Sequence, residues 1–180
     1  VDYLKKNADK FCINGDEIFV VGFSAGGHLT ANLAVDYFSV SAICGEPLDC
    51  KPTAVGLCYP VISEEFGHLR SHENLLKGYP EEEKKKLLAR LNLDKSVTVN
   101  TVPSFIWTTA SDKTVPAQNS IVFALELAKH NVKYELHIYP DGDHGSSTCD
   151  LEVNSYCPAK NAQWIDNCAS FFRLFTTVKF

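Results

Sequence analysis

The sequence predicts an α/β protein in which a parallel sheet lies between two layers of helices. Short apolar runs of strand length alternate along the chain with longer runs of helical spacing. A helix between successive strands implies parallel pairing through right-handed crossovers. With 180 residues, 45% of them hydrophobic, the chain is long enough to bury a core, and we expect residues 1–180 to form one domain.

The strands and helices follow from the pattern in chain order. The predicted strands are 18–23, 54–59, 104–109 and 134–139, the first of them buried on both faces. The predicted helices are an opening one with Val1, Leu4, Ala8 and Phe11 on one stripe, then 25–36, 64–76, 80–91, 116–130 and 163–175. The two helices of residues 63–100 are polar and charged, which indicates a lid-like insertion over one end of the sheet.

Two later helices have apolar stripes that are expected to face the sheet. In helix 116–130 the predicted inner residues are Ile121, Ala124, Leu125 and Ala128. In helix 163–175 they are Trp164, Cys168, Phe171, Phe172 and Phe175. We therefore expect Trp164, like Trp107 on the third strand, to be a core residue rather than a platform for stacking sugars.

The charge pattern excludes several classes of partner. The net charge is -5, and the densest charged run, residues 81–86, mixes both signs as EEEKKK. On a helix this run would pair Glu81 with Lys85 and Glu82 with Lys86, so it is a solvated face. Nucleic acid would require a basic patch, and a membrane span would require about 20 consecutive apolar residues. We expect neither partner.

The seven cysteines have irregular gaps and no C-x-x-C pair, so we expect no zinc site. If the protein is exported, Cys44–Cys50 and Cys149–Cys157 could each bridge a short loop. We favour free thiols, and with them a cytoplasmic location, although a leader peptide would precede residue 1. Cys58 lies in an apolar strand and is predicted to be a small core residue.

The run GFSAGG, which contains Ser24, joins the first strand to a helix. This G-x-S-x-G pattern places a serine on a strained turn, with its hydroxyl raised above the sheet at the positive end of the helix. Side chains two residues before and after the serine would collide there, which explains Gly22 and Gly26. The backbone N–H of Ala25 would point to the position of a developing oxyanion.

A nucleophilic serine needs a base, and His144 is the best candidate among the six histidines. It lies in the glycine-flanked loop YPDGDHG, which leaves the last predicted strand. The others are expected within or at the ends of helices and strands: His28, His68, His72, His130 and His137. His68 and His72 are spaced like metal ligands, but HLRSH lacks the glutamate of H-E-x-x-H, so we expect no metal.

The base needs an orienting carboxylate, and Asp112 is the best candidate. It lies in TASDKTVP, the loop that leaves the third strand, where its simpler role would be a turn or helix N-cap. Asp141 and Asp143 lie too near His144 in sequence for an easy approach and more plausibly shape its loop. All three candidate groups thus follow carboxyl ends of strands, where sites of parallel sheets gather.

These segments resemble a known superfamily. IFVVGFSAGGH, PSFIWTTASDKTVPAQNS and YPDGDHG are similar to the α/β-hydrolase-fold esterases and lipases, especially the small acetyl esterases that include xylan deacetylases. The resemblance implies Ser24 as nucleophile, His144 as base, Asp112 as its orienter and Ala25 in the oxyanion hole. It also implies two-step acyl transfer to water, with no cofactor.

The sequence departs from that fold before Ser24. The family has further strands there and an HGGG-like loop that supplies a second oxyanion donor, and this chain has neither upstream of residue 24. It also lacks methionine and begins inside a helical pattern, so we expect it to be the C-terminal two-thirds of a larger hydrolase. Strand 18–23 would then be an exposed apolar edge that could pair with another copy.

The leading functional prediction is a serine hydrolase of short-chain acyl esters, with an acetylated carbohydrate such as xylan as its substrate. An amide hydrolase of prolyl oligopeptidase or arylformamidase type is an alternative, because those enzymes share GxSxGG and the order of the three residues. A third alternative is a non-catalytic or inactive hydrolase-like module.

Overall fold

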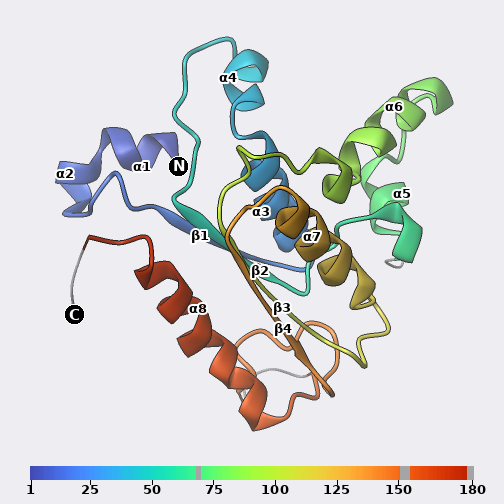
Figure 1. Ribbon diagram of the computed structural model, residues 1–180. Helices are drawn as coiled ribbons and strands as arrows, with labels where there is room; N and C mark the ends of the chain where they lie inside the picture. The colour runs from blue at the N-terminus through green and yellow to red at the C-terminus, as the bar shows by residue number, and fades with distance from the viewer. Residues whose placement is uncertain (68–69, 151–154, 178–180) are drawn as a thin grey trace.

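A computed structural model describes residues 1–67, 70–150 and 155–177 as an α/β sandwich, as predicted. Four parallel strands form one sheet in the order β1-β2-β3-β4: β1 (Phe19–Phe23), β2 (Ala54–Cys58), β3 (Ser104–Thr109) and β4 (Tyr134–Tyr139). Helices α3 (Ala25–Asp36) and α7 (Gln118–Lys129) cover one face of the sheet, and α8 (Gln163–Arg173) covers the other (Figure 1).

The remaining elements are short helices at the ends and between the strands. They are α1 (Asp2–Lys6), α2 (Ala8–Phe11), α4 (Ser39–Cys44), η1 (Glu64–Phe66), α5 (Ser71–Leu75), α6 (Glu81–Leu91), η2 (Leu93–Ser96) and η3 (Ala159–Ala162). None of the helices in the described parts of the chain is both long and apolar enough to cross a bilayer.

Alternate residues of β3 supply two separate cores, because successive side chains of a strand point to opposite faces. Ile106 faces α3 and α7 and packs in a cluster with Phe123 and Leu127. Phe105 and Trp107 belong to the second cluster, on the α8 side of the sheet. That side is strongly aromatic, and both tryptophans are core residues, as predicted.

The aromatic core fixes α8 on the sheet. The rings of Trp107 and Trp164 stack with 5.3 Å between centroids, and Phe171 tilts against Phe105 at 6.2 Å. Cys168, between them on the helix, is buried and lies under Gly56 of β2. All seven cysteines are free thiols, and burial raises the pKa of Cys168 to about 12, so this thiol is an unreactive core residue.

Strand β1 lies at the edge of the described sheet, as the sequence predicted. It pairs only with β2 among the described strands. Val21 is 41% exposed, so the prediction that this strand is buried on both faces is wrong. Pairing of this edge with a second copy stays a prediction.

The inner stripe predicted for α7 is correct for Ala124 and wrong for its other three residues. Ile121, Leu125 and Ala128 are exposed, whereas the helix buries Asn119, Ser120, Phe123, Ala124 and Leu127. The helix has apolar residues on two adjacent stripes, and periodicity does not say which stripe faces the sheet. Phe123 is larger than Ile121 or Leu125, and it fills the space between α7 and β3.

Two predicted helices are interrupted. The opening helix breaks at Asn7, whose side-chain amide donates to the Tyr3 carbonyl, and its stripe is not buried. Predicted helix 64–76 is replaced by η1 and α5, because Gly67 adopts a left-handed φ of 64° after η1. His68 lies outside the described residues.

The charged run of α6 forms ion pairs, but not those predicted. They join Glu81 to Lys84 and Glu82 to Lys85, one residue nearer in the sequence than expected.

The corrected stripe of α7 is tested by a matched pair of leucines. Leu127→Ala is expected to lower the free energy of unfolding by about 2–5 kcal/mol, because it leaves a cavity in a fully buried site. Leu125→Ala, at a side chain that is 51% exposed, is expected to change it by less than about 0.5 kcal/mol. Urea denaturation measures both, and a larger loss in Leu125→Ala would contradict the assignment.

Candidate active site

Ser24 occupies the turn between β1 and α3 in a strained conformation, with φ 53° and ψ -115°. Positive φ is rare for a residue with a side chain, and here it turns the chain sharply from strand to helix. Three backbone hydrogen bonds hold the turn: the Ser24 N–H donates to the Cys58 carbonyl, and the N–H groups of His28 and Val61 donate to the Ser24 carbonyl. The strained turn predicted for GFSAGG is therefore confirmed.

The glycines of this turn have different roles from those predicted. A Cβ on Gly22 would lie 2.2 Å from both the Gly26 carbonyl oxygen and Thr30 Oγ1, so only glycine fits there. A Cβ on Gly26 would meet no described atom within 4 Å, so the collision predicted for that position is wrong. Gly27 is the second crowded position, since its Cβ would lie 2.9 Å from Pro60 Cβ.

The structure brings Ser24, His144 and Asp112 into one hydrogen-bonded row. Ser24 Oγ lies 2.7 Å from His144 Nε2, and His144 Nδ1 lies 2.6 Å from Asp112 Oδ2. These residues are 120 and 32 positions apart in the sequence. The side chain of His144 is 15% exposed and that of Asp112 is 1% exposed, so the row is open to solvent only at its serine and imidazole end.

Asp112 is held by both of its carboxylate oxygens. Oδ1 accepts from the backbone N–H groups of Thr114 and Val115, each at 2.9 Å, which leaves Oδ2 for the imidazole. With the carboxylate on Nδ1, the Nδ1–H tautomer follows, and Nε2 is free to accept from the serine hydroxyl.

Neither of the two rival aspartates is hydrogen-bonded to the imidazole within the described residues, and Asp141 holds the loop through its carboxylate, as expected. Asp141 Oδ1 accepts from the Ser111 hydroxyl at 3.1 Å, and the Asp143 backbone N–H donates to the Tyr156 carbonyl at 2.7 Å. Both residues are exposed. The Thr109 hydroxyl adds a 2.6 Å bond to the Gly142 carbonyl, so the end of β3 and the His144 loop are joined directly.

The other described histidines lie away from this row. His28, on α3, is buried, with Nδ1 3.0 Å from the Val61 carbonyl oxygen. Its ring contacts that of His72 on α5, with 5.2 Å between centroids. His137 contacts Glu135 within β4, and His130 caps the end of α7. In the described parts of the chain, no group of three potential ligands is placed to hold a metal ion.

Two residues at the site were missed by the sequence analysis. Tyr59 directly follows β2, and its ring lies 4.9 Å from that of His144. Asn119, fully buried on α7, accepts through Oδ1 from the N–H groups of Ile62 and Ser63, and so fixes the chain that leaves β2. Tyr59 could have been found, because it occupies the carboxyl end of a strand, where sites of parallel sheets gather.

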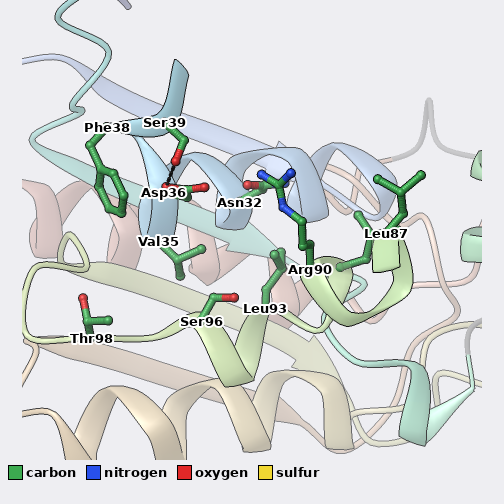
Figure 2. Close-up of a pocket in the computed structure, with 11 residues that line it drawn as sticks. Asn32, Val35, Asp36, Phe38, Ser39, Leu87, Arg90, Leu93, Ser96 and Thr98 are labelled. Carbon is green, nitrogen blue, oxygen red and sulfur yellow. Dashed lines mark hydrogen bonds between the residues drawn. The ribbon is translucent and has the colours of Figure 1, made fainter. Parts of the chain in front are cut away.

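Two cavities in the described structure are lined in part by α3, the helix that follows Ser24. Figure 2 shows a cavity of about 510 Å³ in which Asn32 and Asp36 of α3 face Arg90 of α6. None of the three residues of the row lines it. Another cavity, of about 570 Å³, reaches Ala25 and is lined mainly by residues of α3 and α5, among them His28, Leu29, His72 and Leu75. This second cavity is therefore adjacent to the turn at Ser24.

The sequence of this chain is similar to those of known proteins. Residues 1–171 match the prolyl oligopeptidase family. The chain is 36% identical over 158 residues to endo-1,4-beta-xylanase B of Butyrivibrio fibrisolvens, covering 86% of this chain and 24% of that protein. It is 30% identical over 148 residues to the acetylxylan esterase of Xylanibacter ruminicola, covering 79% of this chain and 28% of that protein.

A solved structure is similar over nearly the whole chain. The acetyl ester-xyloside bifunctional hydrolase of Caldicellulosiruptor lactoaceticus matches with a TM-score of 0.79 and 34% identity, covering 96% of this chain and 62% of that one. The fold is that of the α/β hydrolases, and the resemblance to their esterase branch is confirmed. The chain belongs to the prolyl oligopeptidase family. It spans about a quarter of the length of the curated relatives above.

The two glycines flanking Ser24 are expected to respond differently to the same added methyl group. Gly22→Ala should destabilise the protein by about 3 kcal/mol or more, because backbone at 2.2 Å cannot move aside cheaply. Gly26→Ala should leave stability unchanged or raise it by up to about 1 kcal/mol, since alanine favours the first turn of α3. Thermal and urea unfolding measure both variants, and a Gly26→Ala loss as large as that of Gly22→Ala would refute this assignment.

Proposed function

We propose that this chain carries the active site of a serine ester hydrolase that removes short acyl groups, chiefly acetyl, from a carbohydrate such as xylan. The single observation that carries the proposal is the unbroken row from Ser24 through His144 to Asp112, with bonds of 2.7 and 2.6 Å. A serine hydroxyl, an imidazole and an oriented carboxylate in that order are the parts of acyl transfer through a covalent intermediate.

In the first step, Ser24 Oγ attacks the ester carbonyl carbon while its proton passes to His144 Nε2. The resulting imidazolium is stabilised by Asp112, and it then protonates the leaving alcohol as the ester C–O bond breaks. In the second step, His144 takes a proton from water, and the hydroxide attacks the acyl carbon. The Ser24–acyl bond breaks, the proton returns to Ser24, and the carboxylic acid is released.

Charge on the carbonyl oxygen develops next to the start of α3. The N–H of Ala25 is the first of the helix, so it provides one oxyanion donor reinforced by the helix dipole. Ala25 is exposed, which leaves room for a substrate carbonyl beside it.

The segment 63–100 is proposed to form one wall of the substrate pocket. Its α5 residues His72 and Leu75 line the cavity that begins at Ala25, opposite His28 and Leu29 of α3. This position supports a role in receiving one side of the ester. The relatives named as an acetylxylan esterase and an acetyl ester-xyloside hydrolase support acetylated xylo-oligosaccharides as substrates.

An amide hydrolase is the second candidate, because the chain belongs to the prolyl oligopeptidase family. The same row of side chains would serve either reaction, since both proceed through an acyl-enzyme. The choice therefore depends on the leaving group that the site accepts.

The esterase and the amide hydrolase can be distinguished by assaying the protein with an ester substrate and an amide substrate side by side. We expect hydrolysis of acetylated xylo-oligosaccharide and of a nitrophenyl acetate, with an X-Pro amide cleaved far more slowly. Ser24→Ala is expected to abolish both hydrolysis and labelling by a fluorophosphonate probe, because each requires Oγ. Faster cleavage of the amide would favour the peptidase, and a wild-type protein that is not labelled would favour the inactive module.

The orienting role of Asp112 has a matched control in Asp143. Asp112→Asn is expected to lower kcat by about 10³–10⁴-fold, because an amide can donate to Nδ1 and so select the wrong tautomer. Asp143→Asn changes an exposed carboxylate of the His144 loop in the same way and should retain wild-type kcat. Steady-state kinetics on the acetyl ester measure both, and equal losses would contradict the assignment.

A further inference from the structure

We infer that Tyr59 is a positioning residue that braces His144 against Ser24 from beneath the row. The inference rests on the proposed function, because it concerns the transfer of a proton between these two residues. The glycine and serine pattern around Ser24 assigns no role to this side chain. Contacts of its ring, its hydroxyl and its backbone support the role independently.

The ring of Tyr59 packs directly on the imidazole. Its centroid lies 4.9 Å from that of His144, and the ring planes meet at 67°, which is an edge-to-face contact. The tyrosine is itself immobilised, since its ring lies 5.1 Å from that of Trp107 and 6.0 Å from that of Phe23. Only 3% of Tyr59 is exposed. The imidazole therefore rests on a fixed surface rather than on solvent.

The hydroxyl of Tyr59 holds the same loop at a second point. It accepts a 2.9 Å hydrogen bond from the backbone N–H of Ser147, three residues after His144. The Ser147 carbonyl in turn accepts from Trp164 Nε1 at 3.0 Å, so both sides of this residue are tied to the aromatic core. Burial raises the pKa of Tyr59 to about 12, so the phenol stays neutral at physiological pH.

The backbone of Tyr59 holds the serine side of the pair. Tyr59 has φ 38°, a left-handed conformation that is rare for a bulky residue. Its N–H donates to the Trp107 carbonyl at 2.7 Å. The bend at Tyr59 directs the following chain toward the turn at Ser24, where the Val61 N–H donates to the Ser24 carbonyl. One residue thus braces both partners of the proposed proton transfer.

Two substitutions at Tyr59 and one elsewhere in the aromatic core test this inference in the natural polypeptide. Tyr59→Leu removes the ring and the hydroxyl, whereas Tyr59→Phe removes only the bond to Ser147. Phe105→Leu is the control, because it makes a comparable cavity in the same aromatic core. Phe105 lies on β3 and packs on Phe171 and His137 rather than on Tyr59 or His144. Each variant is measured for kcat and KM on the acetyl ester and for its melting temperature.

We expect Tyr59→Leu to lower kcat about 10²-fold, the cost of a displaced catalytic group, with KM changed less than about twofold. Tyr59→Phe should lower kcat by about two- to tenfold, because it loses the hydrogen bond to Ser147 but keeps the ring contact. The low-field NMR signal of the His144 Nδ1 proton should broaden in Tyr59→Leu through faster exchange with water. Phe105→Leu should lose comparable thermal stability and retain both kcat and that signal.

A wild-type kcat in Tyr59→Leu overturns the inference, as does an equal fall in Phe105→Leu, which would indicate general loosening of the core. If Tyr59→Leu does not fold, Tyr59→Phe decides, and an unchanged kcat together with an unchanged proton signal overturns the inference. A wild-type protein whose Ser24 does not react with fluorophosphonate overturns the proposed function and this inference together. Labelled wild-type protein with active Tyr59→Leu overturns the inference alone.

Discussion

The strained turn at Ser24 is the constraint on which the rest of the site depends. A left-handed residue with a side chain costs about 1–3 kcal/mol unless its surroundings hold it there. Here the surroundings are backbone hydrogen bonds from the first turn of α3 and from the chain around the end of β2. The same turn requires a glycine at position 22, because the Gly26 carbonyl and the Thr30 hydroxyl occupy the space that a Cβ would need. The Ser24 hydroxyl is thus positioned by packing between β1, α3 and β2 rather than by any feature of the serine itself.

The topology sets a distance that the side chains must span. Ser24 follows β1 and Asp112 follows β3, and β2 lies between these strands. Neighbouring strands are about 4.8 Å apart, so the two ends are separated by about 10 Å. The imidazole of His144 bridges that gap from the loop after β4, with 2.7 Å to one side and 2.6 Å to the other. The strand beneath the gap is β2, and Tyr59 at its end occupies the space under the imidazole.

Sequence reasoning succeeded where a local rule fixes the answer. Apolar strands, helix α3 and the serine turn follow from short-range pattern, and parallel strand ends bring Ser24, Asp112 and His144 together. It failed where several arrangements satisfy the same pattern: two stripes of α7 could face the sheet, and only the space beside β3 selects the one with Phe123. Gly26 fits the glycine rule of the motif, although the described structure leaves room there. The role proposed for Tyr59 depends on its contacts with His144 and Ser147, which are distant in the sequence and which no local pattern contains.

The loop that carries His144 illustrates how an irregular segment can hold an imidazole in a defined position. Gly142 and Gly145 both have positive φ, so the backbone follows no regular strand or helix here. The structure ties this loop through side chains instead: Thr109 and Asn161 bond its first part, and Tyr59 and Trp164 bond Ser147. These donors and acceptors come from three separate elements and from the chain after β2, so no single strand or helix sets the position of the imidazole. Its alignment with Ser24 is consequently a property of these particular loop contacts, two of which come from aromatic residues on the α8 side, rather than of the overall stability of that core.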